Sequence, residues 1–420
     1  PITYLSMAQT QCTILCEGQI IEEILSFDYS SDVMAVTENA TFTVDSKNKK
    51  YRDLLQIGQK IEFRLSHPMV NGGAPTTKHR GRIVTRVPHY SPQTGTEIKI
   101  TSADGGWHLE NSHAPIWLRL LGKDFADLCD PNASKLIDPS WDFPGVRFNG
   151  DIKRRLKQGI KTQVALLNQR VIPDPAFVVQ IEPGETAANK IIEFARRYKD
   201  ENNNAGLLLN VSSDGWLCIY KPNDQQKPLY SVRCMDNDPR NNVLEAELTE
   251  TALTRWTEVE VVGEQIESEI PPEGAGDLNN PNAKKKRGHI SHPTALPFVH
   301  RHTVTDGEMV STGQAQTHAE WIYRRGQFDS WSVVYTLNEH YQDGYWYESD
   351  TVVSVSDDEL GIYGNFYVQA VHCSGIKNTG DTTRMIVRKP GLLTASLGEY
   401  DRRASLFKAN SNTGTPKAAP

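Results

Sequence analysis

The chain has 420 residues, of which 38% are hydrophobic and 23% are charged. That composition excludes a disordered chain and, at roughly 150 residues per domain, predicts about three domains. Acidic residues outnumber basic ones by 52 to 45, which gives a net charge of −7 and argues against a protein dedicated to binding nucleic acid. No run of about 18 apolar residues is present, so no membrane insertion is expected.

Residues 1–110 are predicted to form a first small antiparallel β-barrel. Ile61, Phe63 and Leu65 alternate with polar residues, and this period of two marks a strand with one buried face. Short strands separated by turn clusters favour a barrel or a sandwich. The expected strands are 18–27, 40–44, 59–65, 81–85 and 97–101. Cys12 and Cys16 have a spacing that suits one face of a helix, and all six cysteines are expected to be reduced thiols.

Residues 111–240 are predicted to form an α/β region. Its clearest helix has a cap at Glu185 and Thr186 and one apolar face. A hairpin follows, because its turn ends in Gly215 between two apolar runs. The expected elements are short helices at 123–129 and 151–159, the helix 185–199, and strands 207–211 and 216–220.

Residues 241–403 are predicted to form a second β-barrel that contains an inserted linker, 264–297, and a helix, 314–325. The linker is rich in Pro, Gly and Asn, which predicts an exposed insertion that proteases cut first near Lys284–Arg287. That basic run is interpreted as a solvated loop. The expected strands are 257–263, 331–337, 350–356, 366–373 and 383–389. The polar tail, 404–420, is expected to be loose.

No catalytic constellation is found. The chain lacks a G-x-S-x-G nucleophile elbow, a phosphate-binding loop and an H-E-x-x-H zinc helix, so no catalytic residue, cofactor or metal site is predicted. One cluster has a spacing that can bind zinc or nickel: His289, His292, His300 and His302. The segment contains two prolines and no cysteine, so ordinary loop histidines are the favoured interpretation.

Aromatic residues gather between positions 331 and 347. Such a stripe can stack on sugars or bases, but packing in a core or at a subunit interface is the simpler interpretation. The stretch Tyr345–Tyr347 is expected to face outward and to need a partner surface. The members are Trp331, Tyr335, Tyr341, Tyr345, Trp346 and Tyr347.

The order of these elements resembles the family of baseplate hub proteins of phage Mu and related contractile-tail phages. That family also resembles the N-terminal part of type VI secretion spikes. The best match is the strand and G-E-T sequence at 177–186, which leads into the helix and then into Asp214–Leu217. Further similar segments are 55–63, 81–83, 98–104, 315–325, 344–346, 353–355 and 388–390.

The resemblance implies a structural, non-enzymatic subunit that forms a homotrimer. Each copy would contribute two similar barrels, related by roughly 60°, to a ring that adapts a six-fold tail tube to a three-fold spike. The implied partners are the central spike, the tail tube or its initiator and other baseplate proteins, with DNA only in transit. The implied location is the baseplate of a virion tail, after assembly in the host cytoplasm.

Two other classes of function stay open at this point. A tail-associated cell-wall hydrolase would need a paired acid and nucleophile in a cleft. A carbohydrate-binding or nucleic-acid-binding module would use the aromatic cluster. The sequence hardly separates a phage hub from the hub part of a secretion spike.

Overall fold

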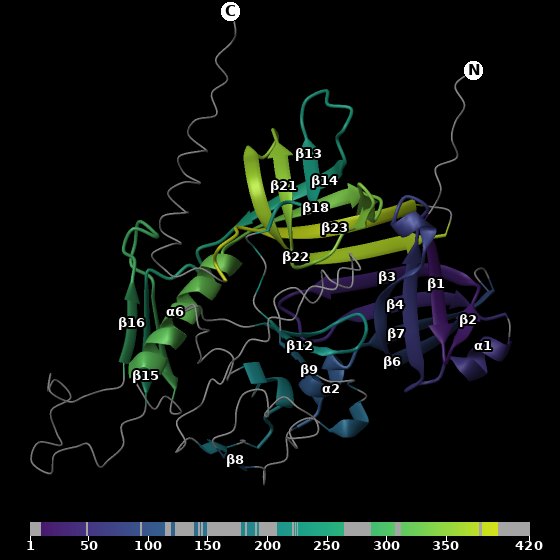
Figure 1. Ribbon diagram of the computed structural model, residues 1–420, viewed down its shortest axis with the longest axis horizontal. Coiled ribbons are helices and arrows are strands. Elements are labelled where there is room, and N and C mark those ends of the chain that lie inside the picture. Colours follow the sequence, from purple (N-terminus) through teal and green to yellow (C-terminus); the bar gives the residue numbers. More distant parts are fainter. Residues whose placement is uncertain are drawn as a thin grey trace, which may run out of the picture. The chain divides into compact units, whose positions relative to one another are not determined.

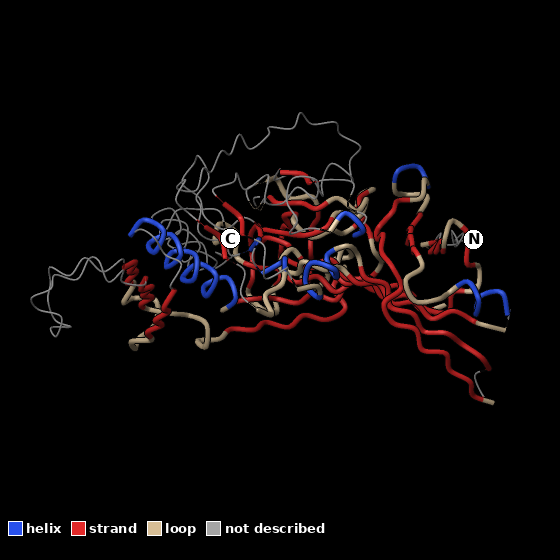
Figure 2. Tube along the Cα trace, turned by 90° about the horizontal axis from the view of Figure 1, so that it is seen from below, coloured by secondary structure: helices blue, strands red, loops and turns tan. Residues whose placement is uncertain are grey.

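Strands dominate the residues that this computed structural model describes (Figure 2). Contacts divide the chain into two units, which are treated separately below. Unit 1 comprises 1–192, 208–248 and 333–388, and unit 2 comprises 193–207, 249–332 and 389–420. The described residues are 10–47, 49–92, 95–113, 119–121, 138–141, 143, 146–148, 178–180, 183–189, 191–192, 208–220, 222, 224, 226–263, 287–306, 312–377 and 380–393.

The N-terminal part of unit 1 follows the alternation of its sequence. Its strands are β1 (Gln11–Cys16), β2 (Gln19–Ile21), β3 (Ile24–Asp32), β4 (Asn39–Asp45), β5 (Lys60–Ser66), β6 (Thr76–Ser91) and β7 (Gly95–Ala103). Two short helices accompany them, α1 (Lys49–Leu54) and α2 (Gly106–Asn111). The strands expected at 40–44, 59–65, 81–85 and 97–101 are confirmed, whereas the expected strand 18–27 is divided between β2 and β3.

Cys12 and Cys16 lie on strand β1, so the expectation that they share a helix face is wrong. In a strand, residues four apart also share a face, and here Cys16 is buried and Cys12 half-buried. The five cysteines within the described ranges are free thiols, and Cys129 falls outside those ranges.

The core of this part is an aromatic cluster centred on Phe63. Every second residue of β4 and β5 is buried, and Phe42 and Phe63 have no exposed surface. The ring centroids of Phe27 and Phe42 both lie 5.3 Å from that of Phe63. Burying one such side chain contributes about 1.5–3 kcal/mol, so the alternation read from the sequence has a direct energetic cause.

The middle of the chain contains two small sheets. β8 (Arg119–Leu121) pairs with β10 (Val178–Gln180), while β9 (Val146–Phe148), β11 (Leu208–Val211) and β12 (Leu217–Tyr220) form the other. The expected hairpin is confirmed by the antiparallel pairing of β11 with β12. The helix cap is confirmed too, because the Asn189 N–H donates to Thr186 Oγ1 at 3.2 Å. The helices expected at 123–129 and 151–159, and positions 193–199 of the helix expected at 185–199, lie outside the described residues.

The C-terminal strands of unit 1 are also close to expectation. They are β13 (Tyr230–Cys234), β14 (Val243–Glu250), β18 (Trp331–Asn338), β19 (Tyr341–Gln342), β20 (Tyr345–Trp346), β21 (Thr351–Asp357), β22 (Ile362–Ile376) and β23 (Gly380–Arg388). The four strands expected between 331 and 389 are confirmed, and the sequence interpretation missed β13 and β14 as strands.

One sheet joins strands from both predicted β regions. Its order is β14-β18-β23-β22-β3-β4-β7-β6-β5-β1-β2, with β21 and β13 branching from β22. The junction is the antiparallel pairing of β3 with β22, in which Asp32 is opposite Ala370 and Ser26 opposite Ile376 (Figure 1). The chain is therefore mainly β, of the α+β type, as expected. The strand order of the described residues is open at both ends, so closure into two barrels is not confirmed.

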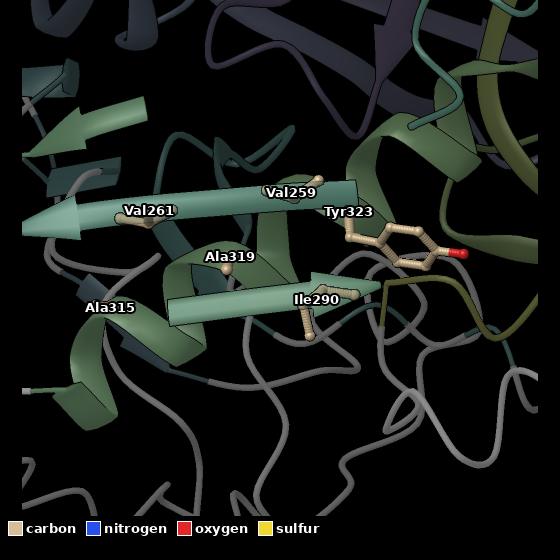
Figure 3. Packing of buried hydrophobic residues seen from close by; sticks show 6 residues of the cluster. All are labelled: Val259, Val261, Ile290, Ala315, Ala319 and Tyr323. Atoms are coloured by element: carbon tan, nitrogen blue, oxygen red, sulfur yellow. The ribbon is translucent and has the colours of Figure 1, made fainter. Parts of the chain in front are cut away.

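Unit 2 contains a three-stranded sheet covered by one helix. β15 (Glu258–Gly263) lies between antiparallel β16 (Arg287–Ser291) and parallel β17 (Arg301–Asp306). Helix α6 (Thr312–Asp329) confirms and extends the helix expected at 314–325. Their shared core consists of Val259, Val261, Ile290, Ala315, Ala319 and Tyr323 (Figure 3).

Close contact between α6 and β16 depends on Gly288. A Cβ atom at this position would lie 2.1 Å from the Ala315 carbonyl oxygen. The linker expected at 264–297 is wrong for its last part, because Arg287–Ser291 form a strand that pairs with β15. Residues 264–286 and 404–420 fall outside the described ranges. Within the described ranges, no helix is both long and apolar enough to cross a bilayer.

Candidate functional site

The four histidines of unit 2 do not converge on one point. His302 is opposite Val259, whose side chain is in the core, whereas His289 is opposite Glu260, so the two imidazoles emerge on opposite faces of the sheet. His289 and His302 are strand residues, so the expectation that all four lie in a loop is wrong. The described residues contain no group of three or more His, Cys, Asp or Glu side chains that could hold a metal ion.

Three of these histidines contact aromatic rings. The His300 and His302 rings lie 4.3 and 4.5 Å from Trp256, and the His292 ring is stacked on Tyr323 at 4.8 Å. His292 therefore contacts a different aromatic side chain from the one that His300 and His302 share. The prediction that they bind no metal stays a prediction.

The aromatic cluster between 331 and 347 belongs mostly to the core. Trp331, Tyr335, Trp346 and Tyr347 are buried, and only Tyr345 is exposed, at 39%. The expectation that Tyr345–Tyr347 face outward is therefore wrong for two of the three residues. A stacking platform for sugars or bases would require exposed rings, which this arrangement does not offer.

A buried carboxylate, Glu38, organises polar side chains inside unit 1. It accepts hydrogen bonds from Tyr29 Oη at 3.1 Å and from Ser31 Oγ at 2.6 Å. Ser31 Oγ also lies 2.7 Å from Ser349 Oγ, on the segment between β20 and β21. The network thus connects the N-terminal strands to a residue 318 positions away. Satisfied buried networks of this kind favour one arrangement of a core over its alternatives.

A second polar contact joins the same two parts of unit 1. Lys78 Nζ lies 2.8 Å from Glu348 Oε1, and its side chain is only 6% exposed. The ammonium group also lies 5.3 Å from the ring centroid of Trp346, whose Nε1 donates to Thr76 Oγ1 at 3.2 Å. A buried ion pair is costly to break, so these contacts hold β6 against the segment that carries Trp346 and Glu348.

Two buried histidines of unit 1 are candidates for acid–base chemistry. His79 Nε2 lies 2.9 Å from Ser102 Oγ, and His340 Nδ1 lies 2.8 Å from Thr383 Oγ1. Burial lowers the pKa of His79 to about 4, although the charge of Glu38 opposes this, and burial lowers the pKa of His340 to about 3. Both rings are neutral near pH 7 and have almost no exposed surface, so they serve packing rather than proton transfer to a substrate.

One cavity of unit 1 has a volume of about 370 Å³. Acidic and basic side chains line it together, including Glu17, Glu62, Arg80 and Arg82, beside the ring of Trp141. Burial opposes ionisation of Glu62, but hydrogen bonds from Arg64, Thr77 and Arg80 lower its pKa to about 2. Glu62 is therefore a paired carboxylate and not a general acid.

The sequence interpretation did not find this cavity, because its walls come from separate segments between Leu15 and Gly215. No single segment has a motif that marks it. Its described lining includes no serine, threonine or cysteine that could act as a nucleophile beside a base.

Comparison with known proteins places the fold. No protein-family model matches the sequence, and no curated protein matches it significantly. The tail protein from Neisseria meningitidis MC58 is similar at a TM-score of 0.67, with 17% identity over 92% of this chain and 98% of that one. The 43 kDa tail protein of prophage MuSo2 from Shewanella oneidensis is similar at a TM-score of 0.64, with 15% identity over 92% of this chain and 100% of that one.

A third similar structure is a Francisella PdpA–VgrG complex. Its TM-score is 0.51, with 10% identity over 93% of this chain and 60% of that one. At such identities the likeness establishes the fold alone. The chain has the fold of phage tail proteins, and the resemblance expected from its sequence is confirmed at that level.

Proposed function

We propose that this chain is a structural subunit of a phage tail, located in the baseplate hub of a contractile tail. One observation carries the proposal: the fold extends over 92% of this chain and almost the full length of two tail proteins. A shared fold does not by itself fix a function, but here no competing constellation was found in the described residues.

The finer form of the proposal is a homotrimeric hub. Each copy would present two β-barrel domains, 1–110 and 241–403, which are separated along the chain by the α/β region 111–240. Three copies would then offer about six similar surfaces to the tail tube and three to the central spike. The partners in this proposal are the spike, the tube or its initiator and other baseplate proteins, with DNA only passing through. The particle would be assembled in the host cytoplasm.

Copy number and location in the tail test this proposal. Electron cryomicroscopy of the intact tail should place three copies around the axis at the baseplate, with their two β regions superposing after a rotation of roughly 60°. Mass measurement of the purified full chain, alone and with the spike protein, checks the trimer independently. One or six copies per tail, or two β regions with unrelated topology, would show that the hub proposal is wrong.

The proposal includes the absence of enzymatic activity and of bound metal. Zymography on peptidoglycan should show no clearing by the full chain, and metal analysis should find no stoichiometric zinc. Zinc that is lost when His289 and His292 are changed to Ala would contradict this part and reopen the hydrolase alternative. Binding of the isolated protein to glycans would favour the carbohydrate-binding alternative instead.

A further inference from the structure

Strand β14 is unusual among the strands of the large sheet. It is eight residues long, yet none of its residues is buried. By contrast, β4, β5 and β18 each bury every second residue. β14 also ends the strand order, with β18 on one side and no described strand on the other. The peptide groups on that outer side are the kind that pair with a strand from another chain.

Other edges of the same sheet are protected. At the opposite end, β2 has only three residues. After Ile83, β6 pairs with β7 alone. This C-terminal half of β6 contains a register shift and Pro88. The outer side of β13 is capped by amide side chains, because the Ser231 and Arg233 N–H groups donate to Gln342 Oε1 and Asn242 Oδ1. Short length, bulges, proline and capping are the usual means by which an edge avoids pairing.

β14 has none of these protections, and the charged side chains that can also protect an edge are here all acidic. Its sequence, V-L-E-A-E-L-T-E, contains no proline, lysine or arginine. Alternate side chains of a strand share a face, so Leu244, Ala246 and Leu248 form one strip and Glu245 and Glu247 belong to the other. Leu244 is 61% exposed, although leucine gains free energy from burial. The strand therefore presents a free edge, an acidic strip, and an apolar strip in which Leu244 is exposed and Ala246 and Leu248 are half-buried.

We propose that β14 binds an extended strand of another tail protein in which basic and apolar residues alternate. Main-chain hydrogen bonds would add that strand beside β14, with its basic side chains opposite Glu245 and Glu247 and its apolar ones opposite Leu244 and Leu248. The proposal identifies a partner surface for the assembly role proposed above. It rests on that role only in taking the bound strand from another tail protein.

Charge argues against a second copy of β14 as the occupant. Antiparallel self-pairing centred on Ala246 would place Glu245 of one copy opposite Glu247 of the other, and the reverse. Like charges directly opposite each other destabilise a strand pair. Shifting the register by one residue would place the apolar strip of one copy beside the acidic strip of the other. A strand in which basic and apolar residues alternate would place basic side chains beside the acidic strip and apolar ones beside the apolar strip.

Binding of two designed peptides to the full chain tests the charge preference. The probes are fluorescent eight-residue peptides, one alternating Val with Lys and the other Val with Glu, each N-methylated along one edge so that it cannot self-associate. Fluorescence anisotropy should show that the native chain prefers the Val–Lys peptide by about tenfold, because two cross-strand charge pairs change sign. The Glu245→Lys, Glu247→Lys variant should prefer the Val–Glu peptide.

A second double variant controls for net charge. Asp53 on α1 and Glu359 in the turn after β21 are also exposed acids, so Asp53→Lys with Glu359→Lys makes the same charge change elsewhere. This variant should keep the native preference. Hydrogen exchange should slow at 243–248 when the Val–Lys peptide is bound.

Four results would overturn the proposal. One is equal binding of both peptides by the native chain, and another is an unreversed preference in the Glu245→Lys, Glu247→Lys variant. The third is an oligomer that dissociates in that variant alone, which would assign the edge to a second copy. A chain that occupies three positions in the tail but binds neither peptide would refute the β14 proposal and leave the assembly role standing.

Discussion

Acidification should destabilise unit 1 through the buried imidazole of His79. Burial lowers the pKa of His79 in the folded chain from 6.5 to about 4, so the unfolded chain binds this proton more readily. The contribution of the neutral His79 ring to the free energy of unfolding is fully present above pH 6.5. It is lost as the pH falls from 6.5 toward 4. At pH 5 the unfolded state is mostly protonated and the folded state mostly neutral. The loss relative to pH 7.5 is about 2 kcal/mol.

Two variants separate this titration from packing. His79→Gln removes the titrating group, so its free energy of unfolding should fall by about 2 kcal/mol less than that of the native chain between pH 7.5 and pH 5. Ser102→Ala removes the hydrogen-bond partner but keeps the imidazole, so it should keep the native pH dependence. Urea denaturation followed by tryptophan fluorescence at both pH values measures these differences. If the free energy of unfolding of His79→Gln falls between pH 7.5 and pH 5 by as much as that of the native chain, the reasoning is refuted.

Three further predictions concern the core contacts. Phe63→Ala should lower the free energy of unfolding by about 3–5 kcal/mol, whereas Val87→Ala, at an exposed position, should change it by less than about 0.5 kcal/mol in the same urea assay. Lys78→Met should cost about 3 kcal/mol because Glu348 loses its partner, and adding Glu348→Gln should recover part of that loss in a double-mutant cycle. Gly288→Ala should speed hydrogen exchange in α6, since the new Cβ would collide with the Ala315 carbonyl; unchanged exchange would contradict the close approach.

Alternation in the sequence was a sound guide to individual strands, because it reports that one face of a strand is buried. It identified β4, β5, β7 and β18 close to their bounds. β14 also alternates apolar and acidic residues, so the same signal was present there, yet the strand was not predicted and none of its residues is buried. The sequence interpretation also missed β16, since Arg287–Ser291 adjoin a segment rich in Pro, Gly and Lys and were assigned to the linker.

Long-range relations were beyond a reading of local pattern. Alternation says that a face is covered but not by what, so it could not reveal that β3 pairs with β22. For the same reason it suggested two closed barrels where the described strands form one open order. The contacts of Glu38, Ser31 and Ser349 depend on that order. The separation of His289 from His302 depends in the same way on strand pairing, in the separate sheet of β15, β16 and β17.

The pairing of β3 with β22 also has a consequence for biosynthesis. β3 is complete once the ribosome has passed Asp32, but its neighbour on one side does not exist until Ala370–Ile376 have been made. At about 5–20 residues per second, that edge stays open for tens of seconds. The nascent chain therefore exposes this strand edge while residues 33–369 are being made, and the sheet can close there only after Ala370–Ile376 have been synthesised. Slow translation or a missing C-terminal segment would leave this edge free to aggregate, even with every earlier strand correctly folded.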